Sequence, residues 1–353
     1  MSDRTWDVIV LGGGTMGTAA AWALATRGAS VLVLEQFGHI HALGSHGGGT
    51  RMFRHAYAES PAYVPLMRRA DDLWCGLETE LGTRIVHRTG VLEMDAPGFD
   101  HARRAKAAAG EHGIEFDWID GDAIRRRWPA FDPPEGWEGG WNPTAGFLDV
   151  EAGLSGLAAI ARRGDVTLRT EEPVLGWSST ATGVEVETAQ GRYTAGTLVV
   201  TAGAWAGEML ADLGLPLTVV RKQNFWLDVE TPANFQPETF PAFATASALG
   251  EIYGFPIFRR PGIKIADHRG GEPTTTATVD RVARDEEAQN CIDLGALAMR
   301  GVSDRVLHGV ICLYTRTPDE HFIVDRHPTA PNVVLAAGFS GHGFKFTPAI
   351  GEQ

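Results

Sequence analysis

The sequence predicts an α/β protein in which a parallel sheet is combined with a second α+β domain that carries a mixed or antiparallel sheet. Residues 8–17 form a short apolar run that ends in a glycine-rich turn and leads into an alanine-rich helix. Similar apolar runs ending in glycine occur at 198–203 and 332–338, as is typical of buried parallel strands. Intervening segments are aromatic and β-branched instead. The parallel sheet is therefore expected to be assembled from distant parts of the chain.

The glycine-rich turn has the spacing of a dinucleotide-binding site. Gly12, Gly14 and Gly17 stand at the G-x-G-x-x-G positions, which allow the tight turn, the approach of a pyrophosphate and close packing of helix on strand. The pyrophosphate would lie on the free N–H groups of the helix N-terminus. The next strand, 31–34, ends in Glu35, an acidic residue placed to accept hydrogen bonds from a ribose diol. This unit by itself does not distinguish NAD from FAD.

Composition excludes several other classes of protein. The 353 residues include 31 basic and 44 acidic side chains, a net charge of −13, which argues against nucleic acid or an anionic membrane as a partner. No apolar run is long enough to span a bilayer, and the first strand begins too early to leave room for a secretory signal. Three well-separated cysteines, Cys75, Cys291 and Cys312, predict reduced thiols rather than disulfides or a metal site. We expect a cytoplasmic protein that binds no metal.

Local patterns predict the remaining elements. A Trp/Pro/Gly-rich region at 128–149 is interpreted as a packed connector between domains. Expected helices cover 62–81, 102–113 and 150–163, and expected strands cover 90–94, 166–168, 184–187, 225–229, 253–256 and 263–265.

Five stretches place unusual polar residues beside glycine or aromatic residues: 44–57, 253–256, 264–268, 312–315 and 338–346. Each has an ordinary explanation when taken alone. Cys312 fits a small buried residue, Lys264 fits the outward position of an alternating strand, and Arg51 and Arg54 fit solvated charges. A functional interpretation depends on the five stretches together.

Together these stretches resemble the family of monomeric sarcosine oxidase and N-methyltryptophan oxidase, within the wider D-amino-acid-oxidase group. The most specific matches are Ser45-His46, Thr50-Arg51, Arg54-His55-Ala56-Tyr57, Tyr253-Gly254-Phe255-Pro256, Asp319-Glu320-His321-Phe322 and Gly338-Phe339-Ser340-Gly341-His342-Gly343-Phe344-Lys345-Phe346. The resemblance implies a Rossmann-type FAD-binding domain (1–85, 146–218 and 322–353) interleaved with a second α+β substrate domain (86–145 and 219–321).

The resemblance also implies the cofactor and the site. FAD is expected, attached covalently through the sulfur of Cys312. The resemblance places Lys264, His268 and Arg51 near the flavin as catalytic residues, and it implies that Arg54, Lys345, Tyr253 and Tyr314 bind substrate. The residues implied to bind FAD, besides Cys312, are Gly12, Gly14, Thr15, Met16, Gly17, Glu35, Ser45, His46, Thr50, Arg51, Val174, Thr201, Gly203, Trp205, Gly338, Gly341, His342, Gly343, Phe344 and Lys345.

Elementary chemistry agrees with this assignment. Oxidation at a C–N bond needs an unprotonated nitrogen, and a pocket containing Arg51, Arg54, Lys264 and Lys345 lowers the pKa of a bound ammonium. The same cations attract a carboxylate, which arginine can hold in two hydrogen bonds. Two departures from the family pattern stand in the glycine loop, where Gly47 replaces a histidine and Gly49 an acidic residue. Family members also continue through a further helix beyond the position of Gln353.

The leading hypothesis is a monomeric FAD-dependent oxidase of N-methyl amino acids, with a small anionic substrate and O2 as its partners and H2O2 as a product. Three alternatives remain at this point. The protein could be a dehydrogenase that passes electrons to another acceptor, an oxidase of cyclic or glycated amino acids, or a flavin-binding subunit without activity.

Overall fold

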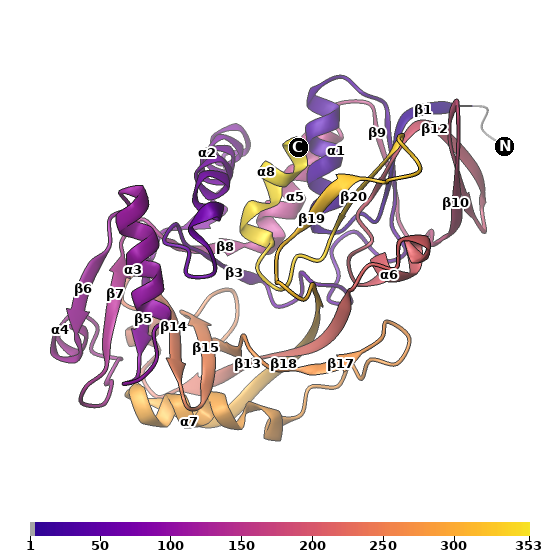
Figure 1. Cartoon of the computed structure of the whole chain (residues 1–353). Coiled ribbons are helices and arrows are strands. Elements are labelled where there is room, and N and C mark those ends of the chain that lie inside the picture. Colours follow the sequence, from indigo (N-terminus) through magenta and orange to yellow (C-terminus); the bar gives the residue numbers. More distant parts are fainter. Residues whose placement is uncertain (1–3) are drawn as a thin grey trace.

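The computed structural model describes residues 4–353, and its two large sheets meet across the middle of the molecule (Figure 1). The first sheet has eight strands, and its parallel part runs in the order β20-β12-β1-β2-β9. The predicted parallel sheet built from distant segments is therefore confirmed. These five strands are β1 (Thr5–Leu11), β2 (Val31–Leu34), β9 (Val166–Arg169), β12 (Gly191–Val200) and β20 (Val333–Ala337).

Helix α1 (Thr15–Thr26) packs on this sheet, and α5 (Val150–Ala161) and α8 (Thr347–Glu352) pack on α1 (Figure 1). A Cβ atom on Gly351 would lie 2.6 Å from the carbonyl oxygen of Ala19, so a glycine is needed for α8 to approach α1. Antiparallel strands complete the sheet, namely β10 (Val174–Thr180), β11 (Gly183–Thr188) and β19 (Ile323–Arg326).

The second sheet has nine strands and is mixed, as predicted. Its order is β17-β13-β16-β15-β14-β5-β7-β6, and β18 pairs with β13 along the opposite edge from β16 and β17. Strand β5 runs parallel to β14 and antiparallel to β7. The strands are β5 (Val91–Asp95), β6 (Asp117–Asp120), β7 (Glu138–Asn142), β13 (Thr218–Val229), β14 (Ala242–Ser247), β15 (Gly250–Phe255), β16 (Ile263–Asp267), β17 (Glu272–Thr274) and β18 (Val302–Arg316).

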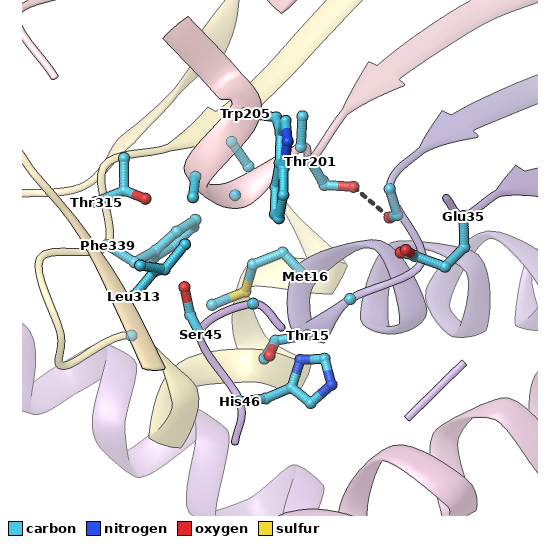
Figure 2. A pocket seen from close by; sticks show the side chains of 18 of the residues that line it. Thr15, Met16, Glu35, Ser45, His46, Thr201, Trp205, Leu313, Thr315 and Phe339 are labelled. Atoms are coloured by element: carbon cyan, nitrogen blue, oxygen red, sulfur yellow. Dashed lines mark hydrogen bonds between the residues drawn. The ribbon is translucent and has the colours of Figure 1, made fainter. Parts of the chain in front are cut away.

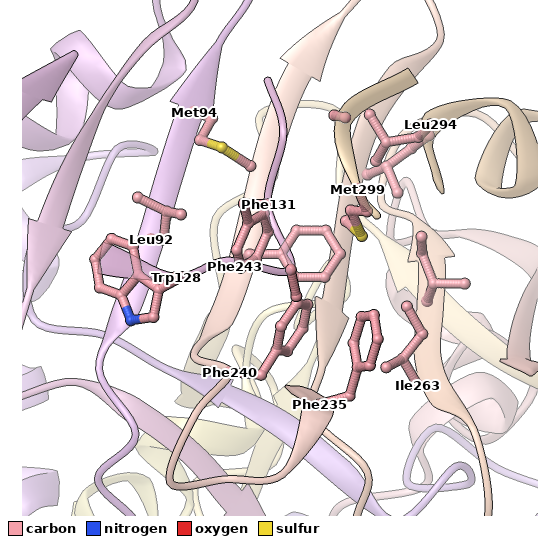
Figure 3. Packing of buried hydrophobic residues seen from close by; sticks show 14 of the residues in the cluster. Leu92, Met94, Trp128, Phe131, Phe235, Phe240, Phe243, Ile263, Leu294 and Met299 are labelled. Atoms are coloured by element: carbon pink, nitrogen blue, oxygen red, sulfur yellow. The ribbon is translucent and has the colours of Figure 1, made fainter. Parts of the chain in front are cut away.

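An aromatic core lies between the second sheet and its covering helix α7 (Gln289–Ala298) (Figure 3). The rings of Phe131 and Phe240 stack with centroids 4.6 Å apart, and Phe243 meets both of them edge-on. The sheet that this core supports forms one wall of the site described below. The remaining helices are α2 (Val64–Leu81), α3 (His101–His112), α4 (Gly121–Arg127) and α6 (Ala206–Met209).

One predicted segment is wrong. The expected connector at 128–149 contains β7 and β8 (Gly146–Asp149), and β8 pairs with β3 (Thr50–Phe53) and β4 (Val86–His87) in a small third sheet. The proline and tryptophan residues of this segment hid the strand pattern. Trp141 of β7 packs directly on Gly90, where a Cβ atom would lie 1.7 Å from the indole ring. Helix α7 and most of β18 were also not predicted. Within residues 4–353, no helix is both long and apolar enough to cross a membrane.

Candidate active site

The turn after β1 has the conformation that its glycines predict. Gly12 has φ +94°, and a Cβ on Gly17 would lie only 1.8 Å from the carbonyl oxygen of Gly12. A Cβ on Gly14 would meet nothing within 4 Å, and Gly14 lines a cavity in front of the α1 N-terminus. The backbone is therefore open to a ligand at the position where a pyrophosphate would bind.

Glu35 stands at one end of this cavity, and Leu313 and Phe339 stand at the other (Figure 2). The Glu35 carboxylate is buried and accepts hydrogen bonds from the backbone N–H groups of Gly13 (2.8 Å) and Phe37 (2.9 Å). Burial raises the pKa of Glu35, and the backbone hydrogen bonds oppose this effect. Its fixed carboxylate at the end of β2 suits a ribose diol.

Most of the predicted FAD-binding residues line this first cavity. The cavity extends from the glycine turn to β18 and to the loop after β20, and its volume is about 170 Å³. The open Gly14, the helix N-terminus and the apolar far end fit an FAD molecule. The predicted residues in the lining are Gly12, Gly14, Thr15, Met16, Glu35, Ser45, His46, Arg51, Val174, Thr201, Gly203, Trp205, Gly338, Gly341, Gly343 and Phe344.

Arg51 holds the glycine-rich loop at the edge of the cavity. Its guanidinium donates to the carbonyl oxygens of Ser45 (2.6 Å), Gly47 (2.8 Å) and Thr50 (2.7 Å). Gly48 and Gly49 have φ values of +88° and +72°, which few other residues adopt without strain. The conformation of the loop therefore depends on the positive φ angles of the two glycines and on the hydrogen bonds from the Arg51 guanidinium.

A second cavity adjoins the first. Arg51, Tyr314, Gly341 and Phe344 line both, so the two spaces meet at these residues. The second cavity has a volume of about 70 Å³, and the other predicted residues in its lining are Arg54, Tyr253, His268, His342 and Lys345. The fold thus brings together residues that lie almost 300 positions apart. Sequence analysis missed three ionisable residues in the same lining, Glu59, His101 and Glu251.

Burial keeps the histidines of the second cavity uncharged. It lowers the pKa of His342 to about 4 and that of His101 to about 3, with nearby cations adding to the effect, and it lowers the pKa of His268 well below its usual value. Burial, followed by the charge of Arg54, lowers the pKa of Lys345 to about 7. Arg54 is therefore the fixed cation of this part of the cavity.

Arg54 has two carboxylate partners. Its Nη2 atom forms an ion pair with Glu59, and its Nη1 atom lies 3.1 Å from Oε1 of Glu93 and 2.9 Å from Nε2 of His101. Burial lowers the pKa of Arg54, but the two carboxylates more than offset this effect and raise it. The guanidinium that the sequence assigned to the substrate carboxylate is thus already neutralised by protein carboxylates.

Gly17, Thr50, Lys264 and Cys312 lie outside these two linings. Nζ of Lys264 donates to the carbonyl oxygen of Thr50 (3.0 Å), which also accepts from Arg51, so one peptide group separates Lys264 from the first two cavities. Lys264 and Thr50 instead line a third cavity of about 320 Å³, with Gly48 and Gly49. Burial, followed by the charge of Arg51, lowers the pKa of Lys264 well below its usual value.

Cys312 is buried in β18, beside the two cavities. Its sulfur accepts a hydrogen bond from Nδ2 of Asn224 (3.3 Å), and Oδ1 of Asn224 accepts one from the hydroxyl of Tyr253 (3.3 Å). Sequence analysis missed Asn224 because a single asparagine inside a strand carries no motif. Its position links the predicted attachment cysteine to the predicted substrate-binding tyrosine.

Comparison with known proteins gives the same assignment as the geometry. Residues 7–353 match the family described as FAD dependent oxidoreductase. The chain belongs to this family. It is 38% identical to monomeric sarcosine oxidase of Streptomyces avermitilis over 99% of the chain and 92% of the relative. It is 32% identical to N-methyl-L-tryptophan oxidase of Yersinia pestis over 98% of the chain and 93% of that relative.

A solved structure shows the same fold. NikD, an unusual amino acid oxidase essential for nikkomycin biosynthesis, superposes with a TM-score of 0.88 at 25% identity, over 99% of this chain and 92% of NikD. The first cavity therefore belongs to a member of the FAD-dependent oxidoreductases, and its lining fits that cofactor.

Proposed function

We propose that this protein is an FAD-dependent oxidase of N-methyl amino acids, which converts the substrate to an imine that water hydrolyses to an amine and an aldehyde, with H2O2 formed from O2. The observation that carries the proposal is the junction of the two cavities at Arg51, Tyr314, Gly341 and Phe344. Relatives named as oxidases of sarcosine and N-methyl-L-tryptophan support it. FAD, when bound, supplies the two-electron acceptor and the reaction with O2.

The residues of the second cavity would bind and orient the substrate. Its carboxylate would lie against Arg54 and Lys345, and its reacting carbon would lie towards the shared edge of the cavities. Tyr253 and Tyr314 would border the amine. Because Arg51 lines the same cavity and donates to carbonyl oxygens rather than to a carboxylate, it would disfavour a protonated amine and lower its pKa. The imidazole of His268 would face the amine as a neutral hydrogen-bonding group, because burial lowers its pKa well below the usual value, and the ammonium proton would leave to solvent.

Several finer points belong to the same proposal. Cys312 is proposed to attach the flavin covalently, and Lys264 to promote the reaction with O2 from behind the Thr50 peptide. The division into an FAD-binding domain (1–85, 146–218, 322–353) and a substrate domain (86–145, 219–321) is proposed on the same grounds. We further propose a cytoplasmic monomer, in keeping with the name of its sarcosine-oxidising relatives.

One experiment tests the activity. The FAD-loaded protein is mixed anaerobically with sarcosine, N-methyltryptophan, proline, pipecolate and a glycated amino acid, and the absorbance of the flavin is followed. We expect bleaching by an N-methyl amino acid, and on admission of air one H2O2 per O2 consumed. Bleaching without rapid oxygen consumption would indicate a dehydrogenase. Preferential bleaching by a cyclic or glycated compound would change the substrate class, and the absence of any bleaching would indicate an inert subunit.

A further inference from the structure

A buried carboxylate stands directly behind the arginine that is proposed to bind substrate. Glu93 lies in the middle of β5, between Ala244 of β14 and Gly140 of β7, and is 1% exposed. Its Oε1 atom accepts a hydrogen bond from Nη1 of Arg54 at 3.1 Å. Within residues 4–353, its Oε2 atom has no hydrogen-bond partner, although Nε2 of His101 lies 3.8 Å away. An ionised carboxylate in this position is therefore only half compensated.

We propose that Glu93 takes up one proton when a carboxylate ligand binds at Arg54, so that ligand binding is coupled to the protonation state of this buried residue. The inference rests on the proposed function, because it assumes that Arg54 faces the substrate carboxylate. It makes Glu93 a positioning residue, which acts on the substrate through Arg54 and does not touch it.

The argument is one of charge. Arg54 already has two carboxylate partners, Glu59 and Glu93, and a third carboxylate would place three negative charges around one guanidinium. Glu59 lines the cavity and has a side chain that is 21% exposed, so it can move aside. Glu93 is enclosed by neighbouring strands and cannot, so it can relieve the repulsion only by becoming neutral.

The surroundings of Glu93 favour its neutral form. Burial raises the pKa of Glu93 to about 7, with Glu59 and Asp95 also raising it and Arg54 lowering it. The other groups that face it are His101, which is uncharged near neutral pH, and Lys345, whose pKa is lowered chiefly by burial and raised in part by the charge of Glu93. Oε2 is the atom to be protonated, because Oε1 is engaged by Arg54. The proton comes from solvent, and no bond other than O–H is formed.

The test uses the FAD-loaded protein and propionate, a carboxylate without an amine to oxidise. Its dissociation constant is measured from the flavin absorbance between pH 5.5 and 9, and proton uptake is measured at pH 8 in weak buffer with an indicator dye. For the unmutated protein, we expect nearly one proton taken up, and a dissociation constant that is flat at low pH and rises about tenfold per pH unit above neutrality.

Matched variants identify the group. Glu93→Gln should bind propionate with little pH dependence and without proton uptake, whereas Asp95→Asn removes another buried carboxylate of β5 and should leave the uptake unchanged. Uptake that persists in Glu93→Gln would assign it to Lys345 and overturn the proposal. If Glu93→Gln does not fold, infrared difference spectra of the unmutated protein with and without propionate test the proposal instead. Binding should create the band of a protonated carboxyl group, and the absence of this band would overturn the proposal.

The outcome is independent of the activity itself. An N-methyl amino acid that bleaches the flavin, together with no proton uptake by propionate, would overturn the coupling and leave the oxidase assignment standing. Proton uptake by propionate without bleaching by any amino acid would support the coupling and overturn the oxidase.

Discussion

The hydroxyl of Tyr57 lies 2.5 Å from Nδ1 of His342, although the two residues are 285 positions apart. Nε2 of His342 lies 2.9 Å from the carbonyl oxygen of Glu320. Because a carbonyl can only accept, Nε2 carries the hydrogen, and Nδ1 accepts the hydroxyl hydrogen of Tyr57. This contact ties the segment that follows β3 to the glycine-rich turn after β20, and so joins the two ends of the candidate active site.

The Tyr57 hydroxyl should therefore matter for stability. Tyr57→Phe keeps the ring packed on Phe346 but leaves Nδ1 of His342 buried without a donor, a loss of about 1–3 kcal/mol in the free energy of unfolding. Chemical denaturation of both proteins measures it. Tyr63→Phe is the control, because its partner His321 is exposed and its other hydrogen bond, from the backbone N–H of Phe322, is long at 3.4 Å, and we expect a change of about 0.5 kcal/mol or less. Equal losses in the two variants would contradict the special role of Tyr57.

The fold could be predicted where local pattern and tertiary burial agree. Strand β2 is buried throughout, so its apolar run is unambiguous, and Gly12 and Gly17 of the first turn are demanded by close backbone contacts. Strand β7 escaped prediction because its residues are glutamate, two glycines, tryptophan and asparagine. Its place is set by pairing with β5 and β6, a long-range effect that no local window contains.

The residues of the candidate active site divide in the same way, into those that a local motif predicts and those that only tertiary contacts bring to the site. Residues within motifs, such as Arg54 and Lys345, could be singled out from the sequence. Glu93 could not, because an acidic residue inside a strand normally predicts a solvent-facing position, whereas both faces of β5 are buried. Its role depends on contact with a residue 39 positions away, and His101 likewise contacts that arginine from 47 positions away. Motifs therefore revealed the cations of the cavity but not the carboxylates that neutralise them.

A second prediction concerns the carboxylate clamp. Arg54→Gln removes a charge-assisted hydrogen bond to the substrate carboxylate, typically about 1.5–3 kcal/mol, so binding should weaken roughly 10- to 100-fold. The loss of affinity is measured as a change in the dissociation constant, obtained by titration of the flavin absorbance. Because this change also leaves Glu93 without its cation, the double variant Arg54→Gln/Glu93→Gln serves as the stability-matched control. Equal turnover of an N-methyl amino acid and its neutral amide by the unmutated protein would exclude the clamp.

A third prediction concerns flavin attachment. If Cys312 carries the flavin, yellow colour should remain on the denatured polypeptide, and Cys312→Ser should release it into the supernatant. Cys291→Ser is the matched control, since Cys291 is equally buried but lies in the aromatic core of the second sheet. Mass spectrometry of the denatured chains measures the adduct directly. Free flavin from the unmutated protein would exclude covalent attachment and leave the fold assignment intact.

The last prediction concerns oxygen. Transfer of one electron to O2 creates a negative charge, and a nearby cation stabilises the developing charge without reorganisation. Lys264 is the candidate, because its ammonium is buried and hydrogen-bonded to Thr50 on the side of the Arg51 loop away from the substrate cavity. Lys264→Met should still allow anaerobic bleaching by substrate, while reoxidation by air slows by about 10²–10³. Stopped-flow absorbance measures the two half-reactions separately.

The pH dependence of reoxidation provides an independent check of Lys264. Its pKa is lowered, chiefly by burial, so the ammonium loses its proton at a pH well below that of an exposed lysine. Reoxidation of the unmutated protein should therefore be fastest at low pH and slow as the pH rises, whereas Lys264→Met should be slow throughout. Lys222→Met, which removes another buried lysine of the second sheet, is the control and should reoxidise normally. Equal slowing of both half-reactions by Lys264→Met would mean that the residue serves the fold or the amine rather than oxygen.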